Sequence, residues 1–494
     1  MIRLVIRASR LERPAWQAEM IARLRALPGV DVAETYESRL LRPADLLIDP
    51  TETAASYDGP LQPRFGIWRF VYGSEARLFE PCAREHAAGE RGVMVRLVAL
   101  GPDGGATVLE TGVFKAAAHS LSATRTRVFD SIAEWPARAL ARVLADREQQ
   151  VRGAPISIST AAKSRGFAKS GMFPQLARRL RQELTEEHWT LGIIRKPVQH
   201  VIDRFDARDI EWLTPPDGAV LADPVGAIER NGRLTILAEA YDFDDRRGRI
   251  VTLEVQNGRV GCAPREVLRQ SVHLSYPHLI VHDGQSYCLP EMSGLGRVQL
   301  FRADPFPDRW LPDRILLGSF AGADATLCRH EGRWWLFACD HNDQDETKLF
   351  LFHATDLFGP WAAHALNPVK CDLRSARPAG PLFEHNGSLY RPAQDCSRTY
   401  GGAVAVNRIR ALTPTEFEEE TINVLAPDPH GPYPDGLHTL TGAGDVTLVD
   451  GKRHARSFKR LAWGLKQLAH ERLRRASPAG GPRGPQDHGS APAG

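Results

Sequence analysis

The amino-acid sequence predicts an α/β domain followed by an all-β five-bladed β-propeller. Strand-like and helix-like stretches alternate over residues 1–150, and from about residue 206 short strand-like runs recur around glycine turns about 50 residues apart. The 494 residues are enough for two or three domains, at about 150 residues per domain. The 42 glycines and 35 prolines suit many short strands and turns better than long helices.

The first 150 residues contain the elements of an open α/β sheet. Residues 2–6 form a strand-like run, and Pro14 then suits the first turn of a helix whose apolar residues recur at helical spacing. Further strand-like runs cover residues 30–35, 65–72 and 93–100. The sequence contains neither GxGxxG nor the P-loop pattern, so a glycine loop that binds nucleotide phosphates is not predicted.

Four segments of this region resemble a formyltransferase-type Rossmann domain: residues 45–49, 65–73, 108–114 and 131–139. The resemblance implies a catalytic Asn-x-His pair at the end of a strand, which would hold an oxyanion and move a proton. At that place this chain has Trp68-Arg69-Phe70, which offers neither the amide nor the imidazole. The resemblance therefore implies a degenerate scaffold rather than a formyltransferase.

The segments outside the two domains differ in composition. Residues 151–205 are interpreted as a linker and docking segment between the domains. Residues 453–476 combine leucines with many arginines and lysines, which predicts a basic amphipathic helix able either to lie on an anionic membrane or to pack on the propeller. Residues 477–494 are rich in Pro, Gly and Ser, which predicts a disordered tail.

The propeller prediction, for residues 206–452, depends on an internal repeat. Turns with a glycine at positions 232, 284, 332 and 387 each join two apolar runs, and a weaker fifth copy begins near Asp435. A strand, a tight hairpin and a second strand are what one propeller blade requires. Five copies therefore predict five blades.

Polar residues open each repeat, just before its first apolar strand. Equivalent blade positions converge on the propeller axis, so these residues are predicted to form one ring. From the first strands the ring takes Asp223, Tyr276, His278, Asp324, Arg377 and His438. From the ends of the second strands it takes Glu239, Glu291, Arg391, Gln394 and Asp395.

The same motifs resemble known propellers. The patterns around Asp223 and Asp324 resemble the five-bladed propellers of glycoside hydrolase family 43. Residues 275–278, 376–380 and 389–396 resemble more closely the N-terminal propeller domain of glucosamine inositolphosphorylceramide transferases and its bacterial relatives. This resemblance covers about residues 190–452, and it implies a protein that acts on carbohydrate.

The hydrolase resemblance implies three catalytic carboxylates. Asp223 matches the base in the first blade, and Asp324 matches the carboxylate in the third blade that orients and tunes the site. The fourth repeat opens with Arg377 where the resemblance places a glutamic acid, and a guanidinium cannot donate a proton to a leaving sugar. Glu291 in the second blade is the candidate substitute.

The remaining ring residues are predicted to bind the ligand. Arginines and histidines beside carboxylates suit a glycan, a sugar phosphate or a glycolipid, bound through Tyr276, His278, Arg377, Arg391, Gln394, Asp395 and His438. The alternative for Arg377 is a buried salt bridge to a ring aspartate. Trp334 and Trp335 are adjacent and must point to opposite faces of a strand, so core packing is predicted for them.

Three functions follow from these residues. The first is a transferase-type role in glycan or glycolipid biosynthesis, as in surface polysaccharide. The second is a glycosidase that uses Asp223, Asp324 and Glu291, and the third is a non-catalytic glycan-binding module.

Composition limits the partners and the location. The net charge of +3 does not support a nucleic-acid surface spread over the molecule. The seven cysteines show no zinc-site spacing, so reduced thiols and neither metal nor cofactor are expected. The N-terminus lacks the apolar run of a signal peptide, and no stretch is long enough to span a membrane. We therefore expect a bacterial cytoplasmic protein, peripheral at the inner membrane if the basic helix binds lipid.

Overall fold

The computed structural model describes most of residues 1–456. Outside the described residues lie 8–12, 37–39, 41, 51–60, 75, 79–80, 102–104, 119, 147–152, 158–184, 214–218, 229–233, 244, 257–258, 261–262 and 457–494. The turn at Gly232, most of the predicted basic helix and the predicted tail fall among these positions. The described residues up to 157 and from 188 to 453 belong to one compact unit.

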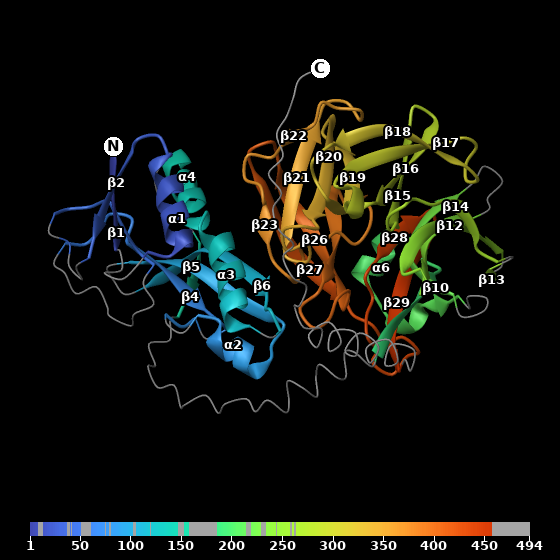
Figure 1. The fold of residues 1–494 in the computed structure, drawn as a ribbon, viewed down its shortest axis with the longest axis horizontal. Helices are drawn as coiled ribbons and strands as arrows, with labels where there is room; N and C mark the ends of the chain where they lie inside the picture. The colour runs from blue at the N-terminus through green and yellow to red at the C-terminus, as the bar shows by residue number, and fades with distance from the viewer. Residues whose placement is uncertain are drawn as a thin grey trace, which may run out of the picture. The chain divides into compact units, whose positions relative to one another are not determined.

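The N-terminal part is an α/β domain built on one mixed sheet (Figure 1). Its strand order is β2-β1-β3-β4-β5-β6-β7. The strands are β1 (Ile2–Arg7), β2 (Val30–Thr35), β3 (Leu46–Asp49), β4 (Ile67–Tyr72), β5 (Gly92–Leu100), β6 (Ala106–Lys115) and β7 (Ala154–Ile156). The helices are α1 (Ala15–Arg25), α2 (Ala83–Ala88), α3 (Leu121–Ile132) and α4 (Trp135–Ala145). The strands predicted from the sequence are confirmed as β1, β2, β4 and β5.

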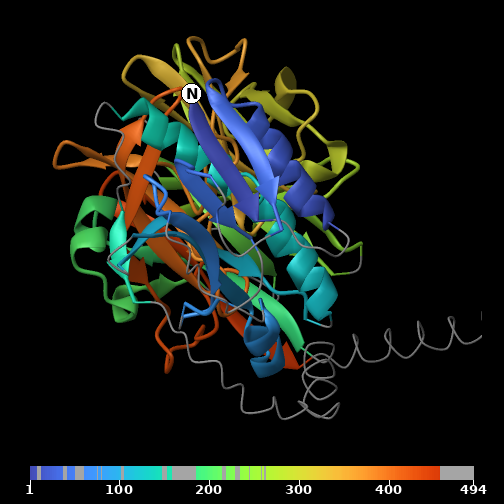
Figure 2. The same cartoon turned by 90° about the vertical axis from the view of Figure 1, so that its left-hand side faces the viewer.

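The two halves of this sheet differ in strand direction. Strands β2, β1, β3 and β4 are parallel, and β5, β6 and β7 continue the sheet antiparallel. Figure 2 shows the paired strands β1 and β2, with β2 at the edge. Strands β3 and β4 are buried along their whole length, as a sheet covered by helices requires. The α/β prediction is confirmed, and the finer resemblance to formyltransferases stays a prediction.

Five separate sheets form the blades of the propeller. Blade 1 contains β10 (Val220–Ile228), β11 (Leu234–Asp242), β12 (Arg247–Gln256), β13 (Arg259–Val260) and β14 (Arg265–Leu268). Blade 2 contains β15 (Ser275–His282), β16 (Gln285–Glu291), β17 (Val298–Ala303) and β18 (Trp310–Leu317). Blade 3 contains β19 (Gly322–His330), β20 (Arg333–Asp340), β21 (Lys348–Ala354), β22 (Ala362–Ala363) and β23 (Lys370–Cys371). Blade 4 contains β24 (Phe383–His385), β25 (Ser388–Asp395), β26 (Ala403–Leu412) and β27 (Phe417–Leu425).

Blade 5 combines two distant parts of the chain. Its order is β28-β29-β8-β9, in which β28 (Leu440–Ala443) and β29 (Val446–Arg456) come from the fifth repeat. Strands β8 (Thr185–Ile194) and β9 (Glu211–Trp212) precede the first repeat. The segment interpreted as a linker and docking segment therefore includes the third strand of the last blade, and this pairing closes the ring. The short helix α6 (Val198–Asp203) connects β8 to β9.

The predicted hairpin turns explain the repeat. Gly284, Gly332 and Gly387 all have positive φ angles, as do the residues before them, Asp283, Glu331 and Asn386. Two successive positive φ angles define the type I′ turn, whose twist matches that of two paired strands. Glycine adopts this conformation without steric cost, which is why the repeat is visible in the sequence.

Apolar clusters fill the spaces between neighbouring blades. One cluster joins each adjacent pair, and the cluster between blades 5 and 1 includes Leu191 and Ile193 of β8 with Ile236 of β11. Trp334 packs in the cluster shared with blade 2, whereas Trp335 packs in the cluster shared with blade 4. The core prediction for both tryptophans is confirmed, because adjacent strand residues face opposite sides of the blade.

The cysteines and the lengths of the helices can be compared with the expectations from the sequence. The six cysteines that the structure describes are free thiols, and five of them are buried. Across the described ranges, no helix is both long enough and apolar enough to cross a membrane.

Blade packing predicts the effect of a substitution at Gly380. This glycine has a φ of 144°, and a Cβ atom there would lie 2.1 Å from the carbonyl oxygen of Leu440 in blade 5. Gly380→Ala should therefore lower the free energy of unfolding by about 1–3 kcal/mol, the usual cost of overpacking. Denaturant unfolding measures this cost. Gly318→Ala, where a Cβ atom meets nothing within 4 Å, is the control, and equal stability of the two variants would contradict the prediction.

Candidate functional site

Three first strands carry a β-bulge at the same place. The pairing register shifts between Ala222 and Val225, between Ser275 and His278, and between Ala323 and Thr326. Within these bulges Asp223, Tyr276 and Asp324 have φ angles of 53°, 45° and 50°. Left-handed backbone is uncommon for residues other than glycine and is found preferentially where a side chain must be re-aimed at a functional site.

Hydrogen bonds between blades hold these bulges. The backbone N–H of Asp223 donates to Asp450 Oδ2 at 3.0 Å, that of Tyr276 to Asp223 Oδ2 at 3.1 Å, and that of Asp324 to Glu291 Oε2 at 3.1 Å. In each case the acceptor belongs to the preceding blade. The polar ring predicted from the repeat is thus connected from blade 5 through blade 3.

Arg377 lies at the centre of a cluster of carboxylates. Its Nε is 2.6 Å from Asp324 Oδ2, its Nη2 is 3.3 Å from Glu291 Oε2, and its Nη1 is 3.1 Å from Asp345 Oδ2. The residue is only 6% exposed. Burial lowers the pKa of Arg377, but the neighbouring charges, first that of Asp324, outweigh burial and raise it. The ion pair to a ring aspartate that the sequence left open is therefore present.

His438 connects two other carboxylates. Its Nε2 lies 3.2 Å from Asp223 Oδ1, and its Nδ1 lies 2.6 Å from Asp450 Oδ2. Burial lowers the pKa of His438, but the charges of Asp450 and Asp223 outweigh burial and raise it. The ring of Trp189 lies against the imidazole, with 3.9 Å between centroids. The arrangement suits a protonated imidazole between two carboxylates.

The two ring aspartates titrate near neutrality. Burial raises the pKa of Asp223 to about 7 against the opposing charge of His438. Burial also raises the pKa of Asp324 to about 7 against the charge of Arg377. Groups with such values can accept or release a proton at physiological pH, which is what acid–base chemistry needs.

Asp223, His438 and Asp450 could also hold a metal ion. Among the described residues they form a group whose ligand atoms lie within 4.8 Å of one another. Asp450, however, already accepts backbone N–H groups from Asp223, His438 and Thr439. Asp450 is therefore already engaged by the backbone as well as by His438.

Several other predicted ligand-binding residues lie in this ring or just beside it. Gln394 donates to Asp324 Oδ2 at 2.7 Å, and Tyr276 Oη lies 2.8 Å from Thr326 Oγ1. His278 Nε2 lies 3.1 Å from the backbone nitrogen of Leu327, and burial lowers its pKa to about 4. A neutral His278 that accepts a backbone hydrogen bond helps to hold blade 2 against blade 3.

Arg391 and Asp395 have different surroundings. Arg391 is fully buried and forms an ion pair with Glu419 of β27, on the outer side of blade 4. Asp395 is half-buried and accepts the backbone N–H of Ser397 at 2.9 Å. Arg391 also donates to the carbonyl oxygens of Ser375 and Ala376, so it holds the segment just before Arg377.

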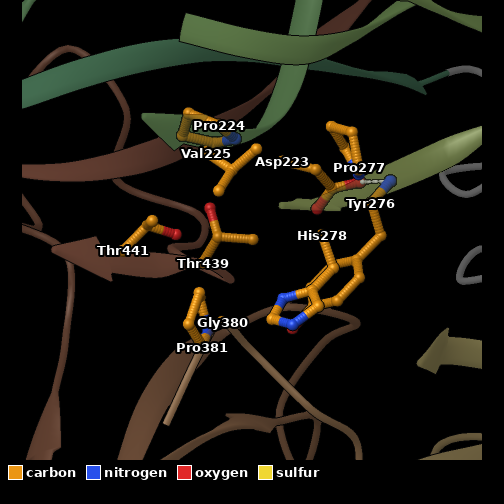
Figure 3. Close-up of a pocket in the computed structure, with 10 residues that line it drawn as sticks. All are labelled: Asp223, Pro224, Val225, Tyr276, Pro277, His278, Gly380, Pro381, Thr439 and Thr441. Atoms are coloured by element: carbon orange, nitrogen blue, oxygen red, sulfur yellow. Dashed lines mark hydrogen bonds between the residues drawn. The ribbon is translucent and has the colours of Figure 1, made fainter. Parts of the chain in front are cut away.

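A small cavity of about 10 Å³ adjoins the ring (Figure 3), which is room for about one water molecule. Figure 3 shows Asp223, Tyr276 and His278 on one side of it and Thr439 and Thr441 on another, with the Tyr276 N–H bonded to Asp223. Residues from blades 1, 2, 4 and 5 thus meet at the propeller axis.

Sequence reasoning missed four residues of the site: Asp345, Tyr400, Trp189 and Asp450. Asp345 and Tyr400 follow second strands in loops of no particular pattern, and Tyr400 lies 5.3 Å below the Arg377 guanidinium. Trp189 comes from β8, which precedes the repeat. Asp450 could have been found, because it stands in the fifth repeat where Glu239 and Glu291 stand in the first two.

The fold and the site define a five-bladed propeller with a buried ring of acidic and basic side chains at its axis. Comparison of sequences links this propeller to one family. Residues 251–431 match the family model described as "Glucosamine inositolphosphorylceramide transferase 1, N-terminal". The resemblance predicted for residues 190–452 is confirmed over this segment.

Curated relatives match the same region. The rice protein (Oryza sativa subsp. japonica) named glucosamine inositolphosphorylceramide transferase 1 is 36% identical over 162 residues, which cover 32% of this chain and 22% of the relative. The Arabidopsis thaliana protein of that name is 34% identical over 157 residues, 31% of this chain and 20% of the relative. The chain thus spans about a fifth of the length of these relatives.

Solved structures with a similar chain path include glycoside hydrolases. An exo-β-1,3-galactanase from Phanerochaete chrysosporium is 11% identical, covers 44% of this chain and 53% of its own, and has a TM-score of 0.35. A family 117 glycoside hydrolase from Zobellia galactanivorans is 13% identical, covers 54% of this chain and 91% of its own, and also has a TM-score of 0.35.

The contacts of His438 predict its titration. In Asp450→Asn the burial that lowers the pKa of His438 remains, while the strongest opposing charge is removed. The pKa of His438 should therefore fall, as measured by NMR titration of the imidazole resonances. Asp445→Asn, in the exposed turn of the same blade, is the control, and an unchanged His438 pKa in Asp450→Asn would contradict the proposed charge pair.

The ion pair of Arg391 predicts a pH-dependent stability. Burial would raise the pKa of Glu419, but the charges of Arg391 and Lys370 outweigh burial and lower it to about 2. Its stabilising contribution is therefore complete above the ordinary value of 4.5 and is lost as the pH falls through about 2.

Glu419→Gln should lower the free energy of unfolding at pH 7 by about 3–5 kcal/mol, because it leaves the buried Arg391 and the partly exposed Lys370 without their carboxylate. It should also flatten the decline of stability between pH 4.5 and 2. Urea unfolding at several pH values measures both effects, with exposed Glu420→Gln as the matched control. A parallel pH dependence of wild type and Glu419→Gln would refute this account.

Proposed function

We propose that this chain is a carbohydrate-active protein that binds a glycan at the propeller axis and acts in glycan or glycolipid biosynthesis, in a step related to glycosyl transfer. The observation that carries the proposal is the axial ring, in which Asp223, Glu291, Asp324, Arg377 and His438 converge from five blades. Carboxylates and a guanidinium form charge-assisted hydrogen bonds with sugar hydroxyls. Tyr400 and Trp189 add aromatic surface of the kind that packs on sugar rings.

The relatives support the carbohydrate class. The name of the rice and Arabidopsis proteins describes transfer of glucosamine to inositolphosphorylceramide. The matched segment is about a fifth of those proteins. A role in glycosyl transfer is therefore proposed for this chain and is not established by the match. The family match supports a glycolipid or a related glycan as the ligand.

The charges of the ring indicate which chemical groups of the ligand the ring binds. Arg377 is matched by Asp324, Glu291 and Asp345, and His438 is matched by Asp223 and Asp450. Carboxylates therefore outnumber cations, and the ring suits hydroxyl or amino groups rather than a phosphate. The phosphate of a sugar phosphate or glycolipid would lie outside the ring.

Hydrolysis is a second candidate function, and the two aspartates with a pKa of about 7 favour it. Glu291, the substitute acid suggested by the sequence, is occupied, because one oxygen accepts the N–H of Asp324 and contacts Arg377. A glycosidase built on Asp223, Asp324 and Glu291 would thus need another proton donor.

For the N-terminal domain we propose a scaffold role derived from a formyltransferase-like fold. Trp68 is fully buried and Arg69 is 3% exposed, and Arg69 Nη2 lies 3.4 Å from Asp49 Oδ2. A buried indole and an ion-paired guanidinium at this strand support a structural use of the place where the resemblance expects catalytic side chains. The cytoplasmic location and the membrane contact through residues 453–476 stay predictions.

Saccharide binding tests the proposal. In saturation-transfer NMR with a panel of neutral, amino and phosphorylated mono- and oligosaccharides, we expect the wild type to bind at least one member. Asp324→Asn should weaken that binding about tenfold or more, because it removes a charged hydrogen-bond acceptor.

The control for this experiment is Asp209→Asn, at an exposed aspartate that forms an ion pair with Lys196. Thermal unfolding of each variant verifies that it folds. The proposal fails if no saccharide in the panel binds, or if Asp324→Asn binds as tightly as Asp209→Asn.

A further inference from the structure

Glu239 occupies a position that recurs in the blades. It pairs with Ala222 across strands β10 and β11, as Glu291 pairs with Ser275 across β15 and β16. Asp450 has the corresponding place in blade 5, one residue beyond the Leu440–Val449 pair. Three blades therefore present a carboxyl group to the axis from the end of the second strand.

Two of these carboxylates have a structural task. Glu291 accepts the backbone N–H of Asp324, and Asp450 accepts that of Asp223, so each holds the bulged first strand of the next blade. Each also lies against a cation, Arg377 for Glu291 and His438 for Asp450. Their oxygens are therefore committed to the fold.

Blade 1 departs from this arrangement. The equivalent N–H of the next blade, that of Tyr276, donates to Asp223 instead of to Glu239. Among the described residues, the close polar contact of Glu239 is with His273, whose Nε2 lies 3.5 Å from Glu239 Oε1. Of the three equivalent carboxyl groups, Glu239 is thus the one that does not accept a backbone N–H from the next blade.

The local backbone orients His273 toward Glu239. The N–H of Gly248 donates to His273 Nδ1 at 2.7 Å, so a neutral imidazole carries its proton on Nε2, the atom that faces Glu239. Burial and the charge of Arg377 lower the pKa of His273, which favours this neutral form. A Cβ atom at Gly248 would lie 2.2 Å from the backbone oxygen of Leu274 and 2.4 Å from Glu239 Oε1, so a side chain there would displace the backbone beside the pair.

The surroundings of Glu239 favour its protonated form. Burial raises its pKa well above the ordinary value, and the charges of Asp223, Glu291, Asp324 and Asp450 raise it further. Its side chain is 11% exposed, and that of His273 is 42% exposed. A neutral carboxyl group among carboxylates, with access to solvent, can donate a hydrogen bond at neutral pH.

We propose that Glu239, oriented by His273, is the proton donor of the axial ring to the leaving oxygen of a glycosidic bond. This inference rests on the proposed function. It assigns the role of general acid, which the guanidinium of Arg377 cannot fill, to Glu239. Glu239 Oε1 faces the His273 N–H, which leaves the proton on Oε2. Catalytic hydrogen bonds are often long before a ligand binds, so the 3.5 Å contact is compatible with this role.

The step balances with the groups present. Asp223, beside His438, takes a proton from a water molecule or an acceptor hydroxyl whose oxygen bonds to the anomeric carbon. The bond from that carbon to the leaving oxygen breaks, and the leaving oxygen takes the proton of Glu239. Exchange with solvent then returns a proton to Glu239 and removes one from Asp223.

Release of phenols from aryl glycosides tests the assignment, since it reports both hydrolysis and transfer to an added alcohol. We expect Glu239→Gln to slow cleavage of phenyl glycosides by about 100-fold or more, the contribution of a positioned acid. It should slow cleavage of 2,4-dinitrophenyl glycosides less than tenfold, because that leaving group needs no proton. Glu266→Gln, at an exposed salt-bridged glutamate of blade 1, should leave both rates unchanged.

A measurement without ligand complements the kinetics. The infrared C=O band of a protonated carboxyl group at pH 7 should be diminished in Glu239→Gln and retained in Glu291→Gln. The assignment is overturned if the band is intact in Glu239→Gln. It is also overturned if Glu239→Gln slows the cleavage of phenyl and 2,4-dinitrophenyl glycosides by the same factor. If the wild type releases no phenol but binds saccharides, the donor role is refuted while the proposed binding function stands.

Discussion

The propeller depends on hydrogen bonds from backbone N–H groups to axial carboxylates of the neighbouring blade. Asp450 holds Asp223, Asp223 holds Tyr276, and Glu291 holds Asp324. Each bond fixes a β-bulge whose left-handed residue would otherwise cost of order 1–3 kcal/mol. The apolar clusters between blades supply most of the driving force for assembly, but these bonds determine which side chains reach the axis.

The same axial carboxylates both hold neighbouring blades together and provide groups for acid–base chemistry. Burial raises the pKa values of Asp223 and Asp324 to about 7, and it does so because the clusters between blades exclude water. Arg377 and His438 then determine which carboxylates remain charged. The same tight packing leaves a cavity of about 10 Å³ beside the ring. The difference between Glu239 and its equivalents Glu291 and Asp450 arises because one N–H group donates to another acceptor.

The repeat made much of the fold predictable. Hairpin glycines such as Gly284, Gly332 and Gly387 are visible because their positive φ angles select glycine, and adjacent Trp334 and Trp335 had to face opposite sides of a strand. The closing strand β8 was not predictable as part of a blade, because it lies outside the repeat and its partner β29 lies at the other end of the propeller sequence. Arg391 and Arg377 are both arginines near ring strands, and only packing separates the first, paired with Glu419, from the second.

The repeat in the sequence was enough to predict five blades, the polar residue that opens each repeat and the residue types near the axis, because strand alternation and turn geometry act locally. Which of those residues form ion pairs with one another, and which hold a neighbouring blade by accepting a backbone N–H, became clear only in the folded propeller. That distinction depends on contacts between residues about 50 to 230 positions apart, such as Asp324 with Arg377 and Asp223 with Asp450. Burial and charge at such contacts are properties of the closed ring, and no single repeat contains them.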